Sequence, residues 1–256
     1  MNAGVRHRRV TQLMGMPISL AVRRQESAET VDAAWSEAVA ELRWVDLVFS
    51  RWRPDSVVSR LSRGELAVAD CPREVAEVLE LGEQAAEASD GAFTMLLPDP
   101  ADPDGVRRLD PTGVVKGWAV ERAARRLAHL RDYCLSAGGD LVCSSEPWAA
   151  PWQIGVEDPH DPTRVLAVVP VTNGAVATSG TAHRGRHLLD GRTGEPAEEL
   201  SSVTVTAASL TVADIDATTA CALGLGAEAW LRDRVAEGRL AHAVVVARDG
   251  SRRILA

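Results

Sequence analysis

The sequence predicts an α+β fold with about five helices. Three observations support this: helical periodicity dominates the first half of the chain, short alternating segments dominate the second half, and the elements come in blocks rather than in strict alternation. The chain has 256 residues, of which 46% are hydrophobic and 25% charged, so it can bury a sizeable core. We expect a single domain over residues 1–256, which could divide into a helix-rich lobe (about 1–135) and a β-rich lobe (136–256).

The first half should contain one strand, three helices and a loop. Residues 14–24 alternate between apolar and polar side chains, as a strand does. Residues 27–50 and 72–89 carry apolar side chains at helical spacing with acidic residues between them, which predicts two helices. Residues 97–113 contain four prolines and four aspartates, so we expect a loop there. The amphipathic residues 114–130 predict the third helix.

The second half should be rich in short strands separated by turn residues. These segments are 133–140, 152–158, 164–171, 174–180, 186–190 and 202–209. A fourth helix is predicted over 210–224 and a fifth over 228–238. Residues 240–255 read as a hairpin, because Asp249 and Gly250 occupy a tight-turn position.

Charge and cysteine content exclude some functions. A net charge of −8 and a pI near 5.3 argue against a general nucleic-acid binder, which needs a concentrated basic face. The basic cluster at 122–126 reads as the solvated face of a helix. The four cysteines form no C-x-x-C pair, so no zinc site is expected. Cys134 and Cys221 lie in apolar runs and read as small core residues.

Targeting signals are not evident in the sequence. The basic N-terminal segment is not followed by an apolar core of secretory length or a small-residue cleavage site. We find no window of about 18 apolar residues that would span a membrane. We therefore expect a cytoplasmic protein without a membrane anchor.

The fourth predicted helix carries unexpected polar residues. Asp214 and Thr218 are four residues apart, so they share one helix face and offer two hard oxygen donors of the kind that Mg²⁺ prefers. Asp216 lies about 200° round the helix from Asp214, so these two cannot chelate one ion. An aspartate near a helix start is also a common N-cap, and the residues alone leave both readings open.

Three other segments could bind or activate a ligand. Lys116 precedes Gly117 at a predicted helix start, where it could meet an anion or simply lie on the surface. The glycine-rich turns at 136–141 and 173–184 could bind phosphate through backbone N–H groups, or be ordinary β-turns. His187 could act as a general base or be a histidine with satisfied hydrogen bonds.

The order of these segments carries more information than any one of them. Eight short motifs follow one another: MGMPIS (14–19), FSRWRPDSVVSRL (49–61), GAFT (91–94), VVKGWAVERA (114–123), AGGD (137–140), AVATSG (175–180), RHLLDGRTG (186–194) and SVTVTAASLTVADIDATTACALG (202–224). In these motifs and their order the sequence resembles the ApbE family, flavin transferases that use FAD to attach FMN to proteins. The resemblance implies a fold related to the T-fold, with mixed β-sheets packed against about five helices.

The resemblance also implies roles for individual residues. Asp214, Thr218 and the backbone carbonyl of Val115 would bind Mg²⁺, and His187 would activate the acceptor hydroxyl. Leu188 would contact the flavin, and the positions that fall where the family binds FAD are Met14, Trp52, Ala92, Phe93, Thr94 and Trp118. Those implied around the pyrophosphate and adenosine are Lys116, Gly138, Gly139, Thr178, Ser179 and Gly180.

The implied reaction is Mg²⁺-dependent transfer of FMN from FAD to a Thr or Ser hydroxyl of an acceptor flavoprotein, with release of AMP. Two alternatives are an FAD pyrophosphatase and a non-catalytic FAD-binding protein. The sequence departs from the family pattern at three positions: Thr94 replaces an aspartate, Ser62 an asparagine and Gly191 a proline. The segment over 94–115 is also shorter than in many members.

Overall fold

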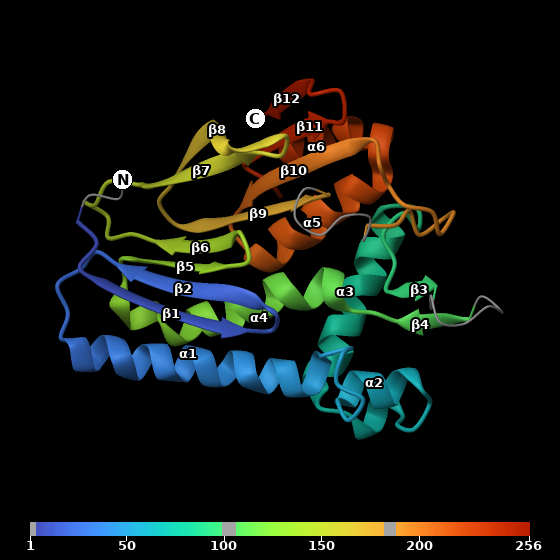
Figure 1. Ribbon diagram of the computed structural model, residues 1–256, viewed down its shortest axis with the longest axis horizontal. Helices are drawn as coiled ribbons and strands as arrows, with labels where there is room; N and C mark the ends of the chain where they lie inside the picture. The colour runs from blue at the N-terminus through green and yellow to red at the C-terminus, as the bar shows by residue number, and fades with distance from the viewer. Residues whose placement is uncertain (1–3, 99–105, 182–187) are drawn as a thin grey trace.

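The computed structural model describes residues 4–98, 106–181 and 188–256 and confirms the α+β class (Figure 1). Its main sheet has eight strands, in the spatial order β1 (His7–Leu13), β2 (Met16–Val22), β5 (Tyr133–Ala137), β6 (Asp140–Ser144), β9 (Gly174–Gly180), β10 (Leu200–Ala207), β11 (His242–Ala247) and β12 (Arg252–Leu255). Two further two-stranded ladders are β3 (Leu96–Pro98) with β4 (Arg107–Leu109) and β7 (Trp152–Asp158) with β8 (Asp161–Val171). Every ladder between the described strands is antiparallel.

The described residues form six α-helices and three short 3₁₀ helices. The α-helices are α1 (Ala28–Phe49), α2 (Val57–Ser62), α3 (Arg73–Ala88), α4 (Thr112–Arg126), α5 (Leu210–Leu223) and α6 (Ala227–Ala236). The 3₁₀ helices are Val68–Asp70, Ala128–Leu130 and Gly224–Gly226. The five helices expected from sequence periodicity are all present, as α1, α3, α4, α5 and α6.

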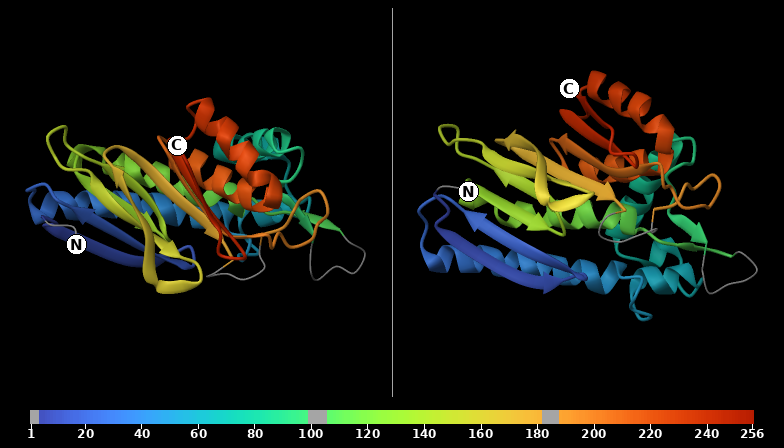
Figure 2. Two further views of the ribbon diagram at one scale, coloured as in Figure 1. Left: turned by 90° about the horizontal axis from the view of Figure 1, so that it is seen from above. Right: turned by 45° about the horizontal axis from the view of Figure 1, so that its top comes forward.

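Side-chain alternation gives the main sheet two different faces. Ile18 and Leu20 of β2 belong to the main hydrophobic core, together with the buried faces of α1, α4 and α5. On the opposite face, Cys134, Cys143 and Trp152 belong to a smaller cluster beneath the β7–β8 ribbon. The helices and this ribbon therefore cover opposite faces of the sheet (Figure 2).

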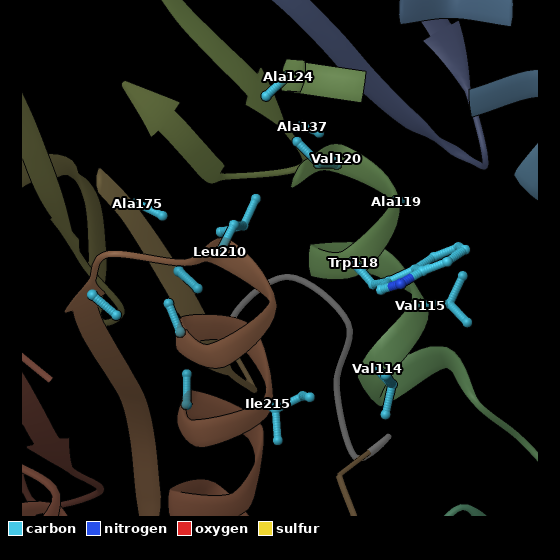
Figure 3. Close-up of a cluster of buried hydrophobic side chains, with 14 of the residues drawn as sticks. Val114, Val115, Trp118, Ala119, Val120, Ala124, Ala137, Ala175, Leu210 and Ile215 are labelled. Atoms are coloured by element: carbon cyan, nitrogen blue, oxygen red, sulfur yellow. The ribbon is translucent and has the colours of Figure 1, made fainter. Parts of the chain in front are cut away.

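Helices α4 and α5 approach each other closely, and Figure 3 shows the buried apolar side chains on both of them. A Cβ atom added at Gly117 of α4 would lie 2.6 Å from Asp214 Cβ and 2.7 Å from the carbonyl oxygen of Leu210, both on α5. Only glycine therefore fits at this crossing without moving one helix. The contact fixes the polar face of α5 beside the start of α4.

Several short elements have no counterpart in the sequence prediction. Strand β1 and helix α2 were not predicted, and the predicted strand over 133–140 ends at Ala137, followed by a turn into the unpredicted β6. The loop prediction for 97–113 was partly wrong, because β3 and β4 pair within it and α4 begins at Thr112.

Two other predictions also need correction. In the described part of the predicted strand over 186–190, only an isolated bridge between Leu189 and Pro196 forms. Arg122 does not lie on a solvated helix face, because its guanidinium is 4.8 Å from the Trp118 ring and 5.6 Å from the Trp44 ring. Aromatic faces attract cations, so this arginine is part of the α1–α4 packing.

One stretch of the described chain is long and apolar enough to cross a membrane, contrary to the sequence prediction. It runs over Leu210–Ala236, and thus through α5, Gly224–Gly226 and α6. Of its most apolar window, 67% is buried inside the protein. The core helices of globular proteins are buried in the same way. The length and apolar composition of this stretch are therefore weak evidence that it spans a membrane.

Candidate functional site

The start of α5 is capped without Asp214. The Ser209 side chain accepts a hydrogen bond from the Val212 amide, and Glu121 Oε2 of α4 accepts one from the Thr211 amide at 2.8 Å. Ser209 is therefore the N-cap. Asp214 lies further into the helix and is 1% exposed, so a capping role cannot explain its presence there.

Asp214 instead belongs to a buried ionic group with Lys116 and Asp140. Lys116 Nζ lies 3.0 Å from Asp214 Oδ1 and 2.7 Å from Asp140 Oδ2. The other oxygen of Asp214 accepts the Gly117 amide at 2.8 Å, and Asp140 Oδ1 accepts the Thr178 amide at 3.1 Å. This group joins α4, α5, β6 and β9, four elements that are far apart in the sequence.

Burial and mutual attraction control the charges of this group. Burial alone would lower the pKa of Lys116, but the carboxylates of Asp214 and Asp140 outweigh it and raise that pKa above its ordinary value. Burial raises the pKa of Asp214, which Lys116 opposes and Asp140 reinforces. With all three groups ionised, the site carries one net negative charge. A further cation at this site would favour the binding of an anionic ligand.

A cavity of about 190 Å³ opens beside this group. The residues predicted for the site that line it are Phe93, Thr94, Lys116, Gly138, Thr178, Ser179, Gly180, Leu188, Asp214 and Thr218. In its wall the Thr218 and Ser179 hydroxyls are 2.9 Å apart, and Asp214 and Thr218 face the same space, as their spacing predicts. The structure thus brings most of the predicted residues together.

A second cavity, of about 490 Å³, adjoins the first at Lys116. Met14, Trp52 and Val115 line it, and Lys116 and Thr112 line both cavities. Trp52 is 82% exposed, a large aromatic surface left open at this cavity.

Other predicted site residues do not line these cavities. Trp118 is buried, donates through Nε1 to Glu77 at 2.8 Å and packs edge-on against Phe49, so its ring supports the core. Ala92 is fully buried, and its carbonyl oxygen accepts the Gly191 amide at 2.8 Å. Gly139 lies in the β5–β6 turn beside the cavity-lining Gly138. His187 lies outside the described residues.

Sequence reasoning missed several residues of the site. Asp140 was quoted within a motif but given no role, although it holds both Lys116 and the Thr178 amide. One available signal was Lys116 itself: it is the single lysine in a chain with 27 arginines. Asp216, which had no assigned role, pairs with Arg239 through both carboxylate oxygens at 2.7 and 3.1 Å.

Comparisons with known proteins match the chain to the ApbE family and to a flavin transferase. The sequence model of the ApbE family matches residues 14–99 and 101–240 of the chain. Among curated proteins, the FAD:protein FMN transferase of Rhodobacter capsulatus is 31% identical over 135 residues. The aligned region covers 49% of this chain and 25% of that relative, so the chain spans only about a quarter of the curated protein's length.

Solved structures support the same fold. An ApbE protein from Thermotoga maritima has a TM-score of 0.80 at 22% identity, with 97% of this chain and 96% of that one covered. A flavin transferase ApbE from Vibrio cholerae has a TM-score of 0.77 at 19% identity, with 97% and 96% covered. The apo form of a flavinyl transferase ApbE from Pseudomonas stutzeri has a TM-score of 0.78 at 24% identity, with 97% and 95% covered. At these identities the similarity establishes the fold.

Proposed function

The chain belongs to the ApbE family, and from this premise we propose that it is a flavin transferase that takes FMN from FAD and attaches it to a protein. The observation that carries the proposal is the shared cavity. Motifs separated by up to about 120 residues of sequence contribute Phe93, Lys116, Ser179 and Asp214 to a single wall. The names of the similar proteins agree with this function.

Mg²⁺ is the metal that the family resemblance implies, and the side chains present fit it. Asp214 Oδ1 and Oδ2 each accept one hydrogen bond or ion pair, and each carboxylate oxygen has a second lone pair to offer. The described residues contain no cluster of three or more His, Cys, Asp or Glu side chains suited to a metal. Mg²⁺ needs only one or two protein carboxylates when substrate phosphates supply the remaining ligands.

We infer that Asp214, the Thr218 hydroxyl and the Val115 carbonyl would hold this ion. When bound, Mg²⁺ would supply positive charge to the pyrophosphate of FAD. Lys116 adds a fixed ammonium group beside the cavity. It stays charged because its ion pairs with Asp140 and Asp214 raise its pKa. Fixed charges of this kind stabilise the negative charge that develops during phosphoryl transfer.

The proposed reaction exchanges the phosphoanhydride bond of the FAD pyrophosphate for a phosphoester bond to the acceptor. A Thr or Ser hydroxyl of the acceptor attacks the FMN-side phosphorus of FAD, the new O–P bond forms, and the bond to AMP breaks. The hydroxyl proton passes to a base, for which we propose His187 on the family resemblance. Leu188, the next residue in the chain, lines the cavity.

The test incubates the protein with FAD and Mg²⁺, with and without a candidate acceptor flavoprotein. We expect AMP together with a covalently fluorescent acceptor band. AMP and free FMN without labelled acceptor would indicate a pyrophosphatase, and bound FAD without AMP would indicate a binding protein. The location of the reaction in the cytoplasm stays a prediction from the sequence.

Asp214→Asn tests the site assignment. The substitution keeps the shape of the side chain but removes its charge, so we expect Mg²⁺-dependent AMP release to fall by about 10- to 100-fold, the loss that removal of even an outer-shell partner of a metal causes. The matched control is Asp233→Asn, the same change at an exposed position on α6, which should leave AMP release unchanged. Circular dichroism of both variants checks that the fold survives. Unchanged AMP release in Asp214→Asn would contradict the assignment.

A further inference from the structure

Two cysteines face each other on the side of the sheet away from the helices. Cys134 of β5 and Cys143 of β6 are direct partners in the ladder, and their Sγ atoms are 3.5 Å apart. Both are free thiols, 7% and 2% exposed, in the cluster beneath the β7–β8 ribbon. Neither lines the cavities of the proposed flavin site.

The register places this pair where a disulfide fits. The β5–β6 turn has two residues, Gly138 and Gly139, both with positive φ, and closes on the pair Ala137 and Asp140. Such a turn closes on a hydrogen-bonded pair, after which non-hydrogen-bonded and hydrogen-bonded pairs alternate. The cysteines are the third pair beyond the closing one, so they form a non-hydrogen-bonded pair.

In such a pair the Cα atoms are about 4.5 Å apart, which lies within the range that disulfides span (about 4.4–6.8 Å). A bond between the two sulfurs therefore needs little backbone movement. The alternative use of paired thiols is metal binding, but the described residues contribute no third ligand beside them. The pair is arranged for oxidation rather than for a metal.

We propose that Cys134 and Cys143 are a dithiol site that a hydroperoxide oxidises to an intramolecular disulfide. One thiolate attacks hydrogen peroxide to give a sulfenic acid and water. The second thiol then displaces the hydroxyl from that sulfur, which forms the S–S bond and releases a second water. The two sulfurs are oxidised, the peroxide is reduced to two waters, and no further reactant is needed.

The structure also predicts that this oxidation is slow in the native state. The hydrogen bond to Cys134 and burial hold the pKa of the Cys143 thiol far above its ordinary value, although the guanidinium of Arg23 opposes this. The reactive thiolate is therefore scarce until the ribbon lifts from the sheet. Once formed, the disulfide would link β5 and β6 covalently. These two strands form a hairpin (Figure 1), and beside its turn Asp140 pairs with Lys116.

The experiment uses the full chain, reduced and then freed of reductant. It is exposed to hydrogen peroxide in buffer and in urea below the unfolding transition, blocked with iodoacetamide and digested with trypsin. No Lys or Arg lies between Asp132 and Arg164, so both cysteines stay in one tryptic peptide. We expect the mass of this peptide to fall by two hydrogens and the peptide to take up no iodoacetamide. This oxidation should be faster in urea than in buffer. Reduction with dithiothreitol should restore alkylation of both cysteines. The oxidised protein should melt about 5 °C higher.

The variants Cys134→Ala and Cys143→Ala should each lose the two-hydrogen product, whereas Cys71→Ala, which removes the half-exposed cysteine, should retain it. Two results would overturn the proposal: both thiols remaining alkylatable in urea, or oxidation of either thiol only to sulfinic or sulfonic acid. Because the readout is a mass and not an activity, the outcome does not depend on the proposed flavin chemistry.

Discussion

At the scale of single residues, Lys116 is the centre of the site. Its ammonium lies between two buried carboxylates, and its side chain is 17% exposed. The chain uses arginine everywhere else, so the choice of lysine here needs a reason. An ammonium is a compact point charge that fits between Asp140 and Asp214, whereas a planar guanidinium needs a wider space. The same compactness leaves room for a ligand beside it.

Replacement of Lys116 by methionine should destabilise the protein strongly. The substitution keeps the length of the side chain but leaves Asp140 and Asp214 buried without their cation, and an uncompensated buried charge costs about 3–5 kcal/mol. Urea unfolding followed by tryptophan fluorescence would measure the loss. The triple variant that also carries Asp140→Asn and Asp214→Asn should recover much of it. Stability of Lys116→Met equal to that of the wild type would contradict this account.

Individual site residues differ in how well the sequence could predict them. Asp214 and Thr218 were predictable as a pair, because helical spacing alone places them on one face. The partnership of Asp140 with Lys116 was not, since it joins a strand to a helix across the fold and depends on tertiary packing. Ser209 could have been recognised as the cap, because a serine directly precedes the apolar run.

At the scale of elements, α4 and α5 form the unit that builds the site. Gly117 allows the two helices to touch, and Glu121 of α4 accepts hydrogen bonds from the first turn of α5. Its Oε2 accepts from Ser209 Oγ at 2.6 Å and from the amide and hydroxyl of Thr211, each at 2.8 Å. A carboxylate at a helix N-terminus is also favoured by the helix dipole. Glu121 therefore fixes α5, and with it Asp214, against α4.

The variant Glu121→Gln should lower stability in a pH-dependent way. Burial of the Glu121 carboxyl raises its pKa, but the hydrogen bonds from Ser209 and Thr211 outweigh this, so the folded-state pKa lies below 4.5. The carboxylate therefore contributes stability above pH 4.5, and this contribution is lost as pH falls through the folded pKa. We expect wild type to exceed the variant by about 1–3 kcal/mol at neutral pH. The difference should shrink in acid.

Urea unfolding at a series of pH values would measure this difference. The matched control is Glu237→Gln, because Glu237 is 58% exposed and its ion pair with Arg234 lies at the surface. Its effect should be within about 0.5 kcal/mol at every pH. A Glu121→Gln deficit that is the same at pH 3 and pH 7 would show that the carboxylate charge does not stabilise α5.

The elements that the sequence predicted well are those whose apolar pattern is long and regular. Helices α1 and α3 fall within the predicted ranges because one face of each packs on the core. Strand β1 carries polar residues along an edge of the sheet, so its sequence shows little of a strand pattern. Strand β6 follows β5 after only two residues, and the predicted segment over 133–140 stops at the first residue of β6. Helix α2 is too short to show periodicity.

At the scale of the whole molecule, one hydrophobic core contains residues from both halves of the chain. Ile18 and Leu42 from the helix-rich half share this cluster with Val203 and Val205 from the β-rich half. The main sheet likewise contains strands from both halves, with β2 paired to β5. Because the two lobes share one sheet and one core, neither lobe has a hydrophobic core of its own. If one lobe unfolds, the other loses the core that stabilises it. The single domain over 1–256 stays a prediction, and this arrangement shows how to test it.

We expect the reduced protein to unfold in one cooperative transition. Tryptophans report on both hydrophobic clusters, because Trp118 lies in the main core and Trp152, on β7, lies in the smaller cluster between the ribbon and the sheet. Urea unfolding followed by tryptophan fluorescence should therefore coincide with far-ultraviolet circular dichroism, which follows the helices and strands together. The variant Trp152→Phe would show whether the ribbon side follows the same curve. Two separated transitions would mean that the lobes unfold independently of each other, and the shared core would then not unfold as one cooperative unit.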